Sequence, residues 1–326
     1  MKEKILQILS EEEGYVSGQE ICGRLGVSRT AVWKWLKKLR EEGYEIESQT
    51  RKGYRLLGRP DILSAEEIRR FLPEGILPGR LEVFPVTDST NEEAKRAYAA
   101  GFPDRSLFVA DQQTAGKGRR GRNWNSPRGK DVFFSFLLRP DIPPECASML
   151  TLIAALAGVR ALSKQAEADY RIKWPNDIVL GGRKICGILT EMGADMDRIH
   201  YVVPGIGFNL NRTEFPEEIR SFAGSVYLET GQKICRSRLV ADYVVEFMRR
   251  YEVFLKAPDL SSFMEEYNAC LINAGQEVCL IRRGEKIRRT ALGINERGEL
   301  LVRDREGQIE TVFSGEVSVR GLYGYV

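Results

Sequence analysis

The residues best suited to chemistry lie in one short run, 116–122, whose sequence GKGRRGR holds four cations, three glycines and no acid. Glycine lets a backbone approach a ligand closely, while Lys and Arg supply positive charge and paired donors for phosphate or carboxylate oxygens. The run therefore predicts a loop that binds an anion. The alternative is a basic loop that is merely solvated.

Two common nucleotide-binding loops do not fit this run. Its glycines match G-x-G-x-x-G, but that pattern needs a helix that begins at the third glycine. Residues 123–129 are instead rich in turn formers, and residues 132–138 resemble a strand. The Walker pattern also fails, because Lys117 is followed by glycine and Asp111 stands where its first glycine belongs. We therefore infer neither a dinucleotide fold nor a P-loop.

The length and composition of the chain predict a soluble protein of two or three domains, because 326 residues exceed what one core usually serves. Its net charge is only +3, so any contact with nucleic acid must come from local clusters of charge. Six scattered cysteines and a single histidine argue against a zinc site or a disulfide framework. Without an N-terminal apolar segment or an apolar run long enough to cross a bilayer, we expect a cytoplasmic protein with no membrane contact.

The first sixty residues are expected to form a winged helix-turn-helix. A capping box at Ser17 opens a helix that Gly26 ends, and Ser28 can cap the next helix. Two short strands, 44–49 and 53–57, then form the wing. A helix pair whose second member has a polar and basic outer face fits the major groove of DNA.

Charge supports DNA binding by this module, which has 12 Lys and Arg against 9 Asp and Glu. The residues expected to contact DNA lie on the outer face of the second helix of the pair or in the wing: Ser28, Arg29, Thr30, Trp33, Lys34, Lys37, Arg51 and Lys52. Arg29, Thr30 and Lys34 are placed to reach bases, and the other cations to reach phosphates. The alternative is a three-helix domain that binds another protein.

The remainder of the chain predicts an α/β domain and then a small β-barrel. After a linker at 58–61, the expected strands are 81–86, 106–113, 132–138, 170–174, 178–180 and 202–211, and the expected helices are 92–100, 149–167, 238–256 and 260–273. Short strands typical of a barrel follow at 277–281, 287–292, 300–302 and 308–313. These patterns place the domains at 1–60, 64–273 and 274–326.

Polar and charged residues mark the beginnings of two of these elements. Residues 87–91 (TDSTN) precede a helix whose free N–H groups favour a polar or anionic ligand, although ordinary capping also accounts for them. Lys184 begins a strand of buried type, where an ammonium cannot remain unpaired. It lies either at the water edge or opposite an anionic ligand.

Four segments together resemble the biotin protein ligases, and specifically the bifunctional kind that also represses the biotin operon. They are 89–91 (STN), 116–124 (GKGRRGRNW), 173–184 (KWPNDIVLGGRK) and 205–209 (GIGFN), in the order and spacing of that family. The resemblance covers essentially the whole chain. It implies an α+β multidomain protein with a winged helix-turn-helix, a central mixed sheet like that of the class II synthetase-like biotin and lipoate ligases, and an SH3-like C-terminal barrel.

The resemblance also implies a two-step reaction that uses ATP, Mg²⁺ and biotin. The carboxylate of biotin attacks the α-phosphorus of MgATP to give biotinyl-5′-adenylate and pyrophosphate. A lysine of a carrier protein, the biotin carboxyl carrier protein of acetyl-CoA carboxylase, then takes the biotin. Bringing one anion to another requires nearby cations, which residues 116–122 and Lys184 supply.

The roles of individual residues follow from the same resemblance. Lys184 and Arg119 are the implied catalytic residues, the first acting on the carboxylate and α-phosphate and the second closing over the adenylate. The implied biotin contacts are Ser89, Thr90, Asn91, Gln113, Lys117, Gly118, Arg119, Trp124, Lys184 and Gly187. The implied nucleotide contacts are Arg119, Arg120, Arg122, Asn176, Lys184 and Asn209. No protein ligand for the metal is assigned, and Mg²⁺ arrives with ATP.

Two departures from the family pattern stand out. Lys117 takes the place of the usual arginine, which keeps the charge but loses the planar fork. Residues 221–230, expected to cover adenine, do not match the usual form, so no stacking residue is assigned.

We expect ligand binding to be coupled to DNA binding. In this hypothesis, bound adenylate favours a homodimer that presents two winged modules to a two-fold operator. Unused adenylate then represses genes of biotin synthesis or uptake. The alternatives are a ligand-sensing repressor without ligase activity, and a lipoate or octanoate ligase with the same central fold.

Overall fold

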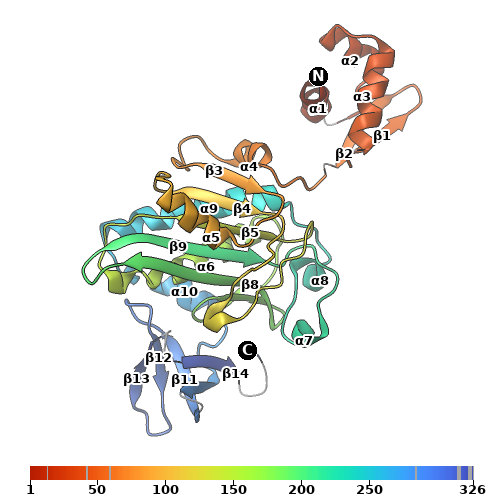
Figure 1. Cartoon of the computed structure of the whole chain (residues 1–326). Coiled ribbons are helices and arrows are strands. Elements are labelled where there is room, and N and C mark those ends of the chain that lie inside the picture. Colours follow the sequence, from red (N-terminus) through yellow and green to blue (C-terminus); the bar gives the residue numbers. More distant parts are fainter. Residues whose placement is uncertain are drawn as a thin grey trace. The chain divides into compact units, whose positions relative to one another are not determined.

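The computed structural model describes residues 1–12, 14–41, 43–58, 60–282, 285–313, 317–321 and 325, with the backbone alone at residues 282 and 317–321. The chain forms two compact units, Met1–Ile62 and Leu63–Val326 (Figure 1).

The smaller unit has the predicted winged helix-turn-helix fold. Its elements are α1 (Lys2–Glu11), α2 (Gly18–Leu25), α3 (Arg29–Glu41), β1 (Glu45–Gln49) and β2 (Gly53–Gly58). The Ser17 hydroxyl accepts a hydrogen bond from the Glu20 backbone N–H at 3.1 Å, and Gly26 ends α2 with a φ of 65°, which confirms the predicted cap and turn. The three helices bury one apolar core, and β1 and β2 pair antiparallel as the wing.

A seven-stranded mixed sheet forms the centre of the larger unit, in the order β3-β4-β5-β9-β8-β7-β6. Its strands are β3 (Leu81–Phe84), β4 (Ser106–Ala110), β5 (Val132–Leu137), β6 (Arg171–Lys173), β7 (Asp177–Leu180), β8 (Arg183–Ala194) and β9 (Ile199–Phe208). Strands β3 and β4 pair in parallel, and the other neighbours pair antiparallel. The predicted mixed sheet is confirmed.

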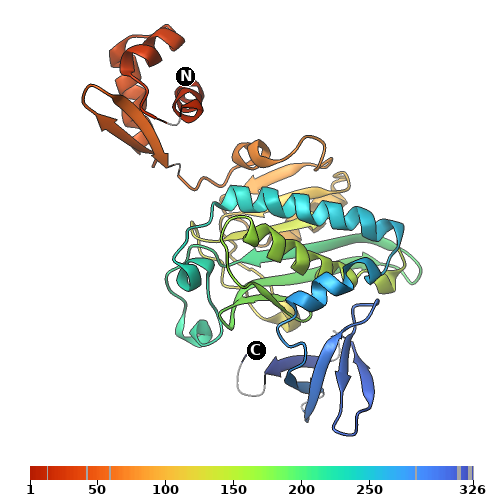
Figure 2. The same ribbon diagram turned by 180° about the vertical axis from the view of Figure 1, so that it is seen from behind.

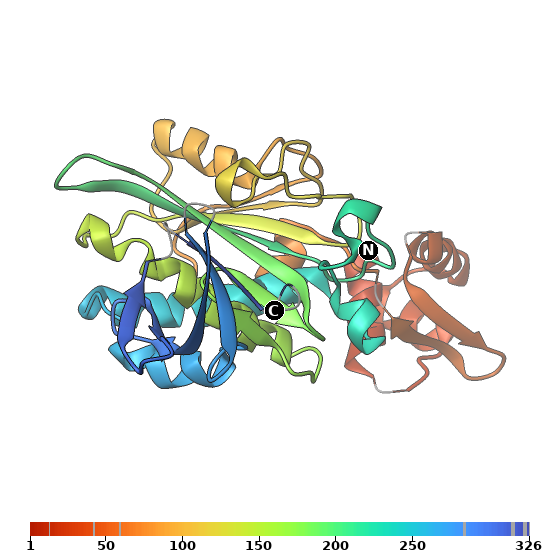
Figure 3. The same ribbon diagram turned by 90° about the horizontal axis from the view of Figure 1, so that it is seen from below.

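Helices cover both faces of this sheet. They are α4 (Ala65–Phe71), α5 (Thr90–Ala99), α6 (Met149–Ser163), α9 (Arg236–Lys256) and α10 (Met264–Cys270). Two short helices, α7 (Glu217–Arg220) and α8 (Val226–Thr230), lie beyond one end of the sheet (Figure 1). Helix α5 lies on one face, and α6 and α9 lie side by side on the other (Figures 2 and 3). The sheet is thus the middle layer of three.

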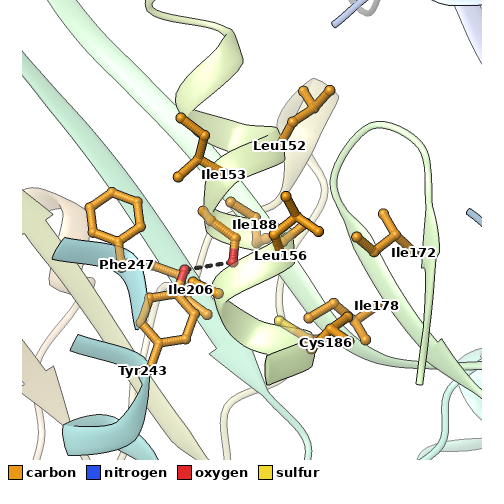
Figure 4. Packing of buried hydrophobic residues seen from close by; sticks show 14 of the residues in the cluster. Leu152, Ile153, Leu156, Ile172, Ile178, Cys186, Ile188, Ile206, Tyr243 and Phe247 are labelled. Carbon is orange, nitrogen blue, oxygen red and sulfur yellow. Dashed lines mark hydrogen bonds between the residues drawn. The ribbon is translucent and has the colours of Figure 1, made fainter. Parts of the chain in front are cut away.

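Helix α6 is apolar on nearly all sides because it lies between the sheet and α9. Leu156 packs among aliphatic side chains of the sheet, and the Tyr243 hydroxyl of α9 donates a hydrogen bond to the Ala154 carbonyl at 2.9 Å (Figure 4). By length and composition, the stretch Pro144–Ser163 is apolar enough to span a membrane, so the expectation that the chain has no such run is wrong. The fold buries 72% of the most apolar part of that stretch, as expected of a core helix.

The C-terminal part is an antiparallel five-stranded sheet in the order β13-β12-β11-β10-β14. Its strands are β10 (Glu277–Arg282), β11 (Glu285–Ile294), β12 (Leu300–Arg303), β13 (Ile309–Val312) and β14 (Val317–Gly321). Four of these strands are the predicted ones. The fifth strand, β14, was not predicted. It pairs antiparallel with β10, which is distant in sequence, and a local pattern does not reveal such a pairing.

The predicted elements differ from the observed ones mainly at their ends. The helix expected over 149–167 ends at Ser163, where the chain turns and buries Ala166 against the core. The helix expected over 260–273 is a short 3₁₀ turn, Ser261–Phe263, followed by α10. The short helices α7 and α8 were not predicted, because one or two turns contain too few residues for a periodic pattern.

Replacement of Leu156 by Ala is expected to lower the free energy of unfolding of the larger unit by about 2–5 kcal/mol, since the side chain is 1% exposed and its loss leaves a cavity. Leu228→Ala is the matched control, because that leucine is 42% exposed. Denaturant unfolding followed by circular dichroism measures both, and equal destabilisation by the two changes would contradict the assignment of α6 to the core.

Candidate active site

Glycines on the two longest strands of the seven-stranded sheet, β8 and β9, form the floor of the site. A Cβ atom on Gly187 of β8 would lie 2.6 Å from the Trp124 ring, and one on Gly207 of β9 would lie 2.6 Å from Trp124 Nε1. A Cβ atom on Gly205 would clash with the Asn91 side chain. The missing side chains thus let Trp124 and Asn91 lie flat against the sheet, a close approach that only glycine permits.

A first cavity opens above this floor. All ten residues predicted to contact biotin line it: Ser89, Thr90, Asn91, Gln113, Lys117, Gly118, Arg119, Trp124, Lys184 and Gly187. They come from the start of α5, the loop after β4, and strand β8. The fold therefore brings together residues nearly one hundred positions apart in sequence.

A hydrogen-bonded group closes the inner end of the first cavity. The Thr90 backbone N–H donates to Gln113 Oε1 at 2.9 Å, and Gln113 Nε2 donates to Ser126 Oγ at 3.1 Å. The Ser135 hydroxyl lies 2.7 Å from Thr90 Oγ1 and 2.6 Å from Asn91 Oδ1. Such a buried set of donors and acceptors suits a neutral polar ring better than an ion. Ser135 was not predicted, because a lone serine within an apolar strand has no distinctive pattern.

A second cavity, of about 390 Å³, adjoins the first. All six predicted nucleotide contacts line it: Arg119, Arg120, Arg122, Asn176, Lys184 and Asn209. Residues that line both cavities mark their junction: Gly118, Arg119, Trp124, Asn176 and Lys184. Apolar side chains from the segment around α7 form another wall: Phe215, Ile219, Phe222 and Ala223. The lining is therefore polar in the first cavity, cationic at the junction and apolar along one wall of the second cavity.

Lys184 lies at the junction of the two cavities. Its Nζ lies 2.6 Å from Asp177 Oδ1, and it is 5.0 Å from the centroid of the Trp124 ring. Asp177 Oδ1 also accepts a hydrogen bond from Asn176 Nδ2 at 3.1 Å. Adjacent antiparallel strands β7 and β8, joined by a turn in which Gly181 and Gly182 have positive φ, carry this ion pair.

Arg119 reaches the same junction from the glycine-rich loop, residues 116–125, which contains the cationic run 116–122. Its Nη1 donates to Asn176 Oδ1 at 2.8 Å, although the two residues are 57 positions apart. Burial lowers the pKa of the Arg119 guanidinium, while the charge of Asp177 opposes this effect. Since an arginine pKa is ordinarily far above neutrality, the group stays a cation. Two cations, Arg119 and Lys184, thus lie at the junction of the cavities, where they can hold the anionic part of a ligand.

Lys117 lines the first cavity, but its ammonium pairs with an acid at the rim. Lys117 Nζ lies 2.6 Å from Glu92 Oε1, which also lies 3.0 Å from Lys95 Nζ. Hydrogen bonds from Lys117 first and Lys95 second lower the pKa of Glu92. The ion pair is therefore intact at neutral pH and is lost as the pH falls through the lowered value. Glu92 was not predicted as part of the site.

A buried ion pair, also unpredicted, anchors the far end of the glycine-rich loop. Arg212 Nε donates to Asp131 Oδ2 at 2.7 Å, and Arg212 Nη1 donates to Asn125 Oδ1 at 2.7 Å. The Asp131 side chain has no exposed surface, and its Oδ1 accepts a hydrogen bond from the Leu210 backbone N–H at 2.9 Å. An acid directly before a strand as apolar as β5 was a signal that could have been noticed, because a buried carboxylate needs a partner.

In the smaller unit, the predicted DNA contacts are all exposed: Ser28, Arg29, Thr30, Trp33, Lys34, Lys37, Arg51 and Lys52. Trp33 is 53% exposed, which is unusual for a tryptophan on a helix that buries its other face. Lys37 Nζ lies 5.8 Å from the centroid of the Trp33 ring. The outer face of α3 is thus polar and basic with one aromatic ring, a surface compatible with the major groove of DNA.

Comparisons with known proteins give consistent results along the chain. Three family models match: an HTH domain at residues 2–55, the Biotin/lipoate A/B protein ligase family at 83–209, and the Biotin protein ligase C terminal domain at 274–320. The bifunctional ligase/repressor BirA of Bacillus subtilis is 37% identical over 324 residues, 98% of each chain. BirA of Escherichia coli is 30% identical over 317 residues, 97% of this chain and 96% of that one.

A solved structure agrees with these relatives. The biotin protein ligase from Aquifex aeolicus in complex with biotin and ATP has a TM-score of 0.65 and 31% sequence identity, and the match covers 74% of this chain and 99% of that one.

Asn176→Ala is expected to release Arg119 and so to loosen the glycine-rich loop. Trypsin should then cleave after Arg119 or Arg120 about tenfold faster, because one charge-assisted hydrogen bond is lost. Mass spectrometry of the early fragments measures the rate, and cleavage elsewhere in the chain serves as the internal control. Unchanged cleavage within the loop would show that Asn176 does not hold it.

Proposed function

This chain belongs to the biotin protein ligases, in the class with an N-terminal helix-turn-helix, and we propose that it both joins biotin to a carrier protein and represses transcription. The observation that carries the proposal is the junction of the two cavities, where Lys184 and Arg119 meet although they come from separate segments. We assign DNA binding to residues 1–60, ligation to 64–273, and a supporting role to 274–326.

In the first step, biotin lies in the first cavity and ATP in the second. A carboxylate oxygen of biotin bonds to the α-phosphorus. The bond between that phosphorus and the oxygen shared with the β-phosphorus breaks, which releases pyrophosphate. Lys184 and Arg119 reduce the repulsion between the two anions and stabilise charge that builds up on the phosphoryl oxygens. Their position at the junction, where the carboxylate and α-phosphate must meet, supports these roles.

In the second step, the amine of a carrier lysine attacks the carbonyl carbon of the mixed anhydride. An amide forms, the amine loses a proton, and AMP leaves. The glycine-rich loop, with Lys117 and Gly118 on one cavity and Arg120 and Arg122 on the other, keeps water away from the reactive anhydride until the carrier arrives. The carrier we propose is the biotin carboxyl carrier protein of acetyl-CoA carboxylase.

In the first cavity, Ser89, Thr90 and Gln113 hold the ureido ring of biotin. Ser89 and Thr90 are buried, and Gln113 accepts a hydrogen bond from the Thr90 backbone N–H. Trp124 packs on the bicyclic ring, over the gap left by Gly187 and its neighbour on β9. Asn176 and Asn209 orient the nucleotide. Mg²⁺ arrives with ATP, and phosphate oxygens are among the ligands that it prefers.

The repressor role rests on the smaller unit. Bound adenylate favours a homodimer, and two winged modules then contact the two halves of an operator, so that unused adenylate reduces biotin synthesis or uptake. Because its carrier and its operator are both intracellular, we place the protein in the cytoplasm.

Lys184→Ala is expected to lower the rate of biotin-dependent exchange of pyrophosphate into ATP by at least about a hundredfold, as for other groups that stabilise developing charge. Lys256→Ala, an exposed change at the end of α9, should leave the rate unchanged. Ligand-free DNA binding should be equal in both variants. A Lys184→Ala protein that still forms adenylate at the wild-type rate would refute the catalytic role.

Operator binding should tighten when biotin and ATP are both present. Lys34→Ala should weaken that binding about tenfold, because the lysine lies on the exposed face of α3, whereas Lys4→Ala on α1 should have little effect. Mobility-shift titrations at fixed salt measure both changes. An affinity that does not respond to biotin and ATP would contradict the coupling between ligation and repression.

A further inference from the structure

Residues 173–177, which are the turn between β6 and β7 with the strand residue on either side, line the second cavity. The C-terminal part of the chain contacts this segment in two places. Trp174 Nε1 donates a hydrogen bond to the Gly298 carbonyl at 2.9 Å, from the turn between β11 and β12. The second contact comes from Tyr325, which lies beyond β14. The site is therefore supported from outside the central sheet.

Tyr325 makes three contacts with residues that line the second cavity, and it lines that cavity itself. Its hydroxyl donates a short hydrogen bond to Asp177 Oδ2. Lys173 Nζ lies 3.3 Å from the centroid of its ring, and the Phe222 ring stacks on it at 5.6 Å with an interplanar angle of 25°. Because Lys173 is only 5% exposed, the face of an aromatic ring is a stabilising neighbour for its charge.

Asp177 connects this tyrosine with Lys184. One carboxylate oxygen accepts from Tyr325, and the other lies 2.6 Å from Lys184 Nζ. Lys184 and Asn176 both contact Oδ1 of this carboxylate, whereas Tyr325 contacts Oδ2. Because the terminal torsion of an aspartate is broad, a carboxylate held at both oxygens is more restricted than one held at a single oxygen. The hydroxyl of Tyr325 thus limits the directions from which Asp177 can hold the lysine.

We propose that Tyr325 is a positioning residue for ligation, whose hydroxyl fixes Asp177 so that Asp177 holds the Lys184 ammonium at the junction of the two cavities. This inference rests on the proposed function, and it gives the C-terminal part of the chain a specific role in the first chemical step. The ring of Tyr325 anchors the residue between Lys173 and Phe222, and the hydroxyl provides the alignment.

The test uses the full chain with Tyr325→Phe, which keeps the ring and removes only the hydroxyl. The kcat of biotin-dependent pyrophosphate exchange should fall about tenfold, the effect of losing one hydrogen bond to a charged group. The KM for biotin should stay within about twofold of the wild-type value, since the residues proposed to hold the ureido ring are untouched. Tyr267→Phe is the matched control, because that buried hydroxyl has no hydrogen-bond partner among the described residues.

A double-mutant cycle with Asp177→Ala separates alignment from simple packing. If Tyr325 acts through the carboxylate, Tyr325→Phe has no further effect on kcat once Asp177 is an alanine. Wild-type kcat in Tyr325→Phe, or an equal loss with and without the carboxylate, overturns the proposal.

A second measurement does not depend on ligase activity. The rate at which acetic anhydride labels Lys184, followed by mass spectrometry, should rise in Tyr325→Phe and stay unchanged in Tyr267→Phe. An unchanged labelling rate in Tyr325→Phe also overturns the proposal. If the wild-type chain forms no adenylate, the proposed function fails, while this labelling still decides whether Tyr325 holds Lys184 through Asp177.

Discussion

The ion pair between Lys184 and Asp177 is the interaction around which the rest of the site is arranged. An ammonium at the start of a strand of the central sheet needs a counter-charge. Asp177, on the neighbouring strand, provides it, and its Oδ1 lies 2.6 Å from Lys184 Nζ. The same pairing keeps the ammonium at the point where the two cavities meet. The register between β7 and β8, which have a two-glycine turn between them, therefore decides where the ammonium lies.

Around this pair, the fold combines a floor of paired strands with a loop that covers it. Strands β8 and β9 pair along nearly their whole length, and their glycines let Trp124 and Asn91 lie close against the sheet. The cover is the glycine-rich loop, in which Arg120 and Gly121 both have positive φ. Two hydrogen bonds hold the loop in place without burying it. Arg119 of the loop donates to Asn176, and Arg212 donates to Asn125. Such an arrangement can admit substrates and then retain a reactive product.

Much of this arrangement could be predicted from the sequence, because the chemistry is concentrated in short motifs. The cationic loop, Lys184 and the capped helices of the winged module each carry a local pattern, and the structure places the loop and Lys184 on the same cavities. The partners of these residues could not be predicted. Arg212 and Asp131 are 81 positions apart, and Tyr325 and Asp177 are 148 apart, so neither spacing nor periodicity connects them. Element ends were also misjudged where tertiary packing, and not local preference, stops the helix.

The most direct measurement is a crystal structure of the full chain grown with biotin, ATP and Mg²⁺. The account predicts one biotinyl-5′-adenylate molecule across both cavities, with its ring system over Gly205 and Gly207 and its phosphate within hydrogen-bonding distance of Lys184 and Arg119. Biotin and nucleotide bound at separate places, or a phosphate that neither cation reaches, would contradict it.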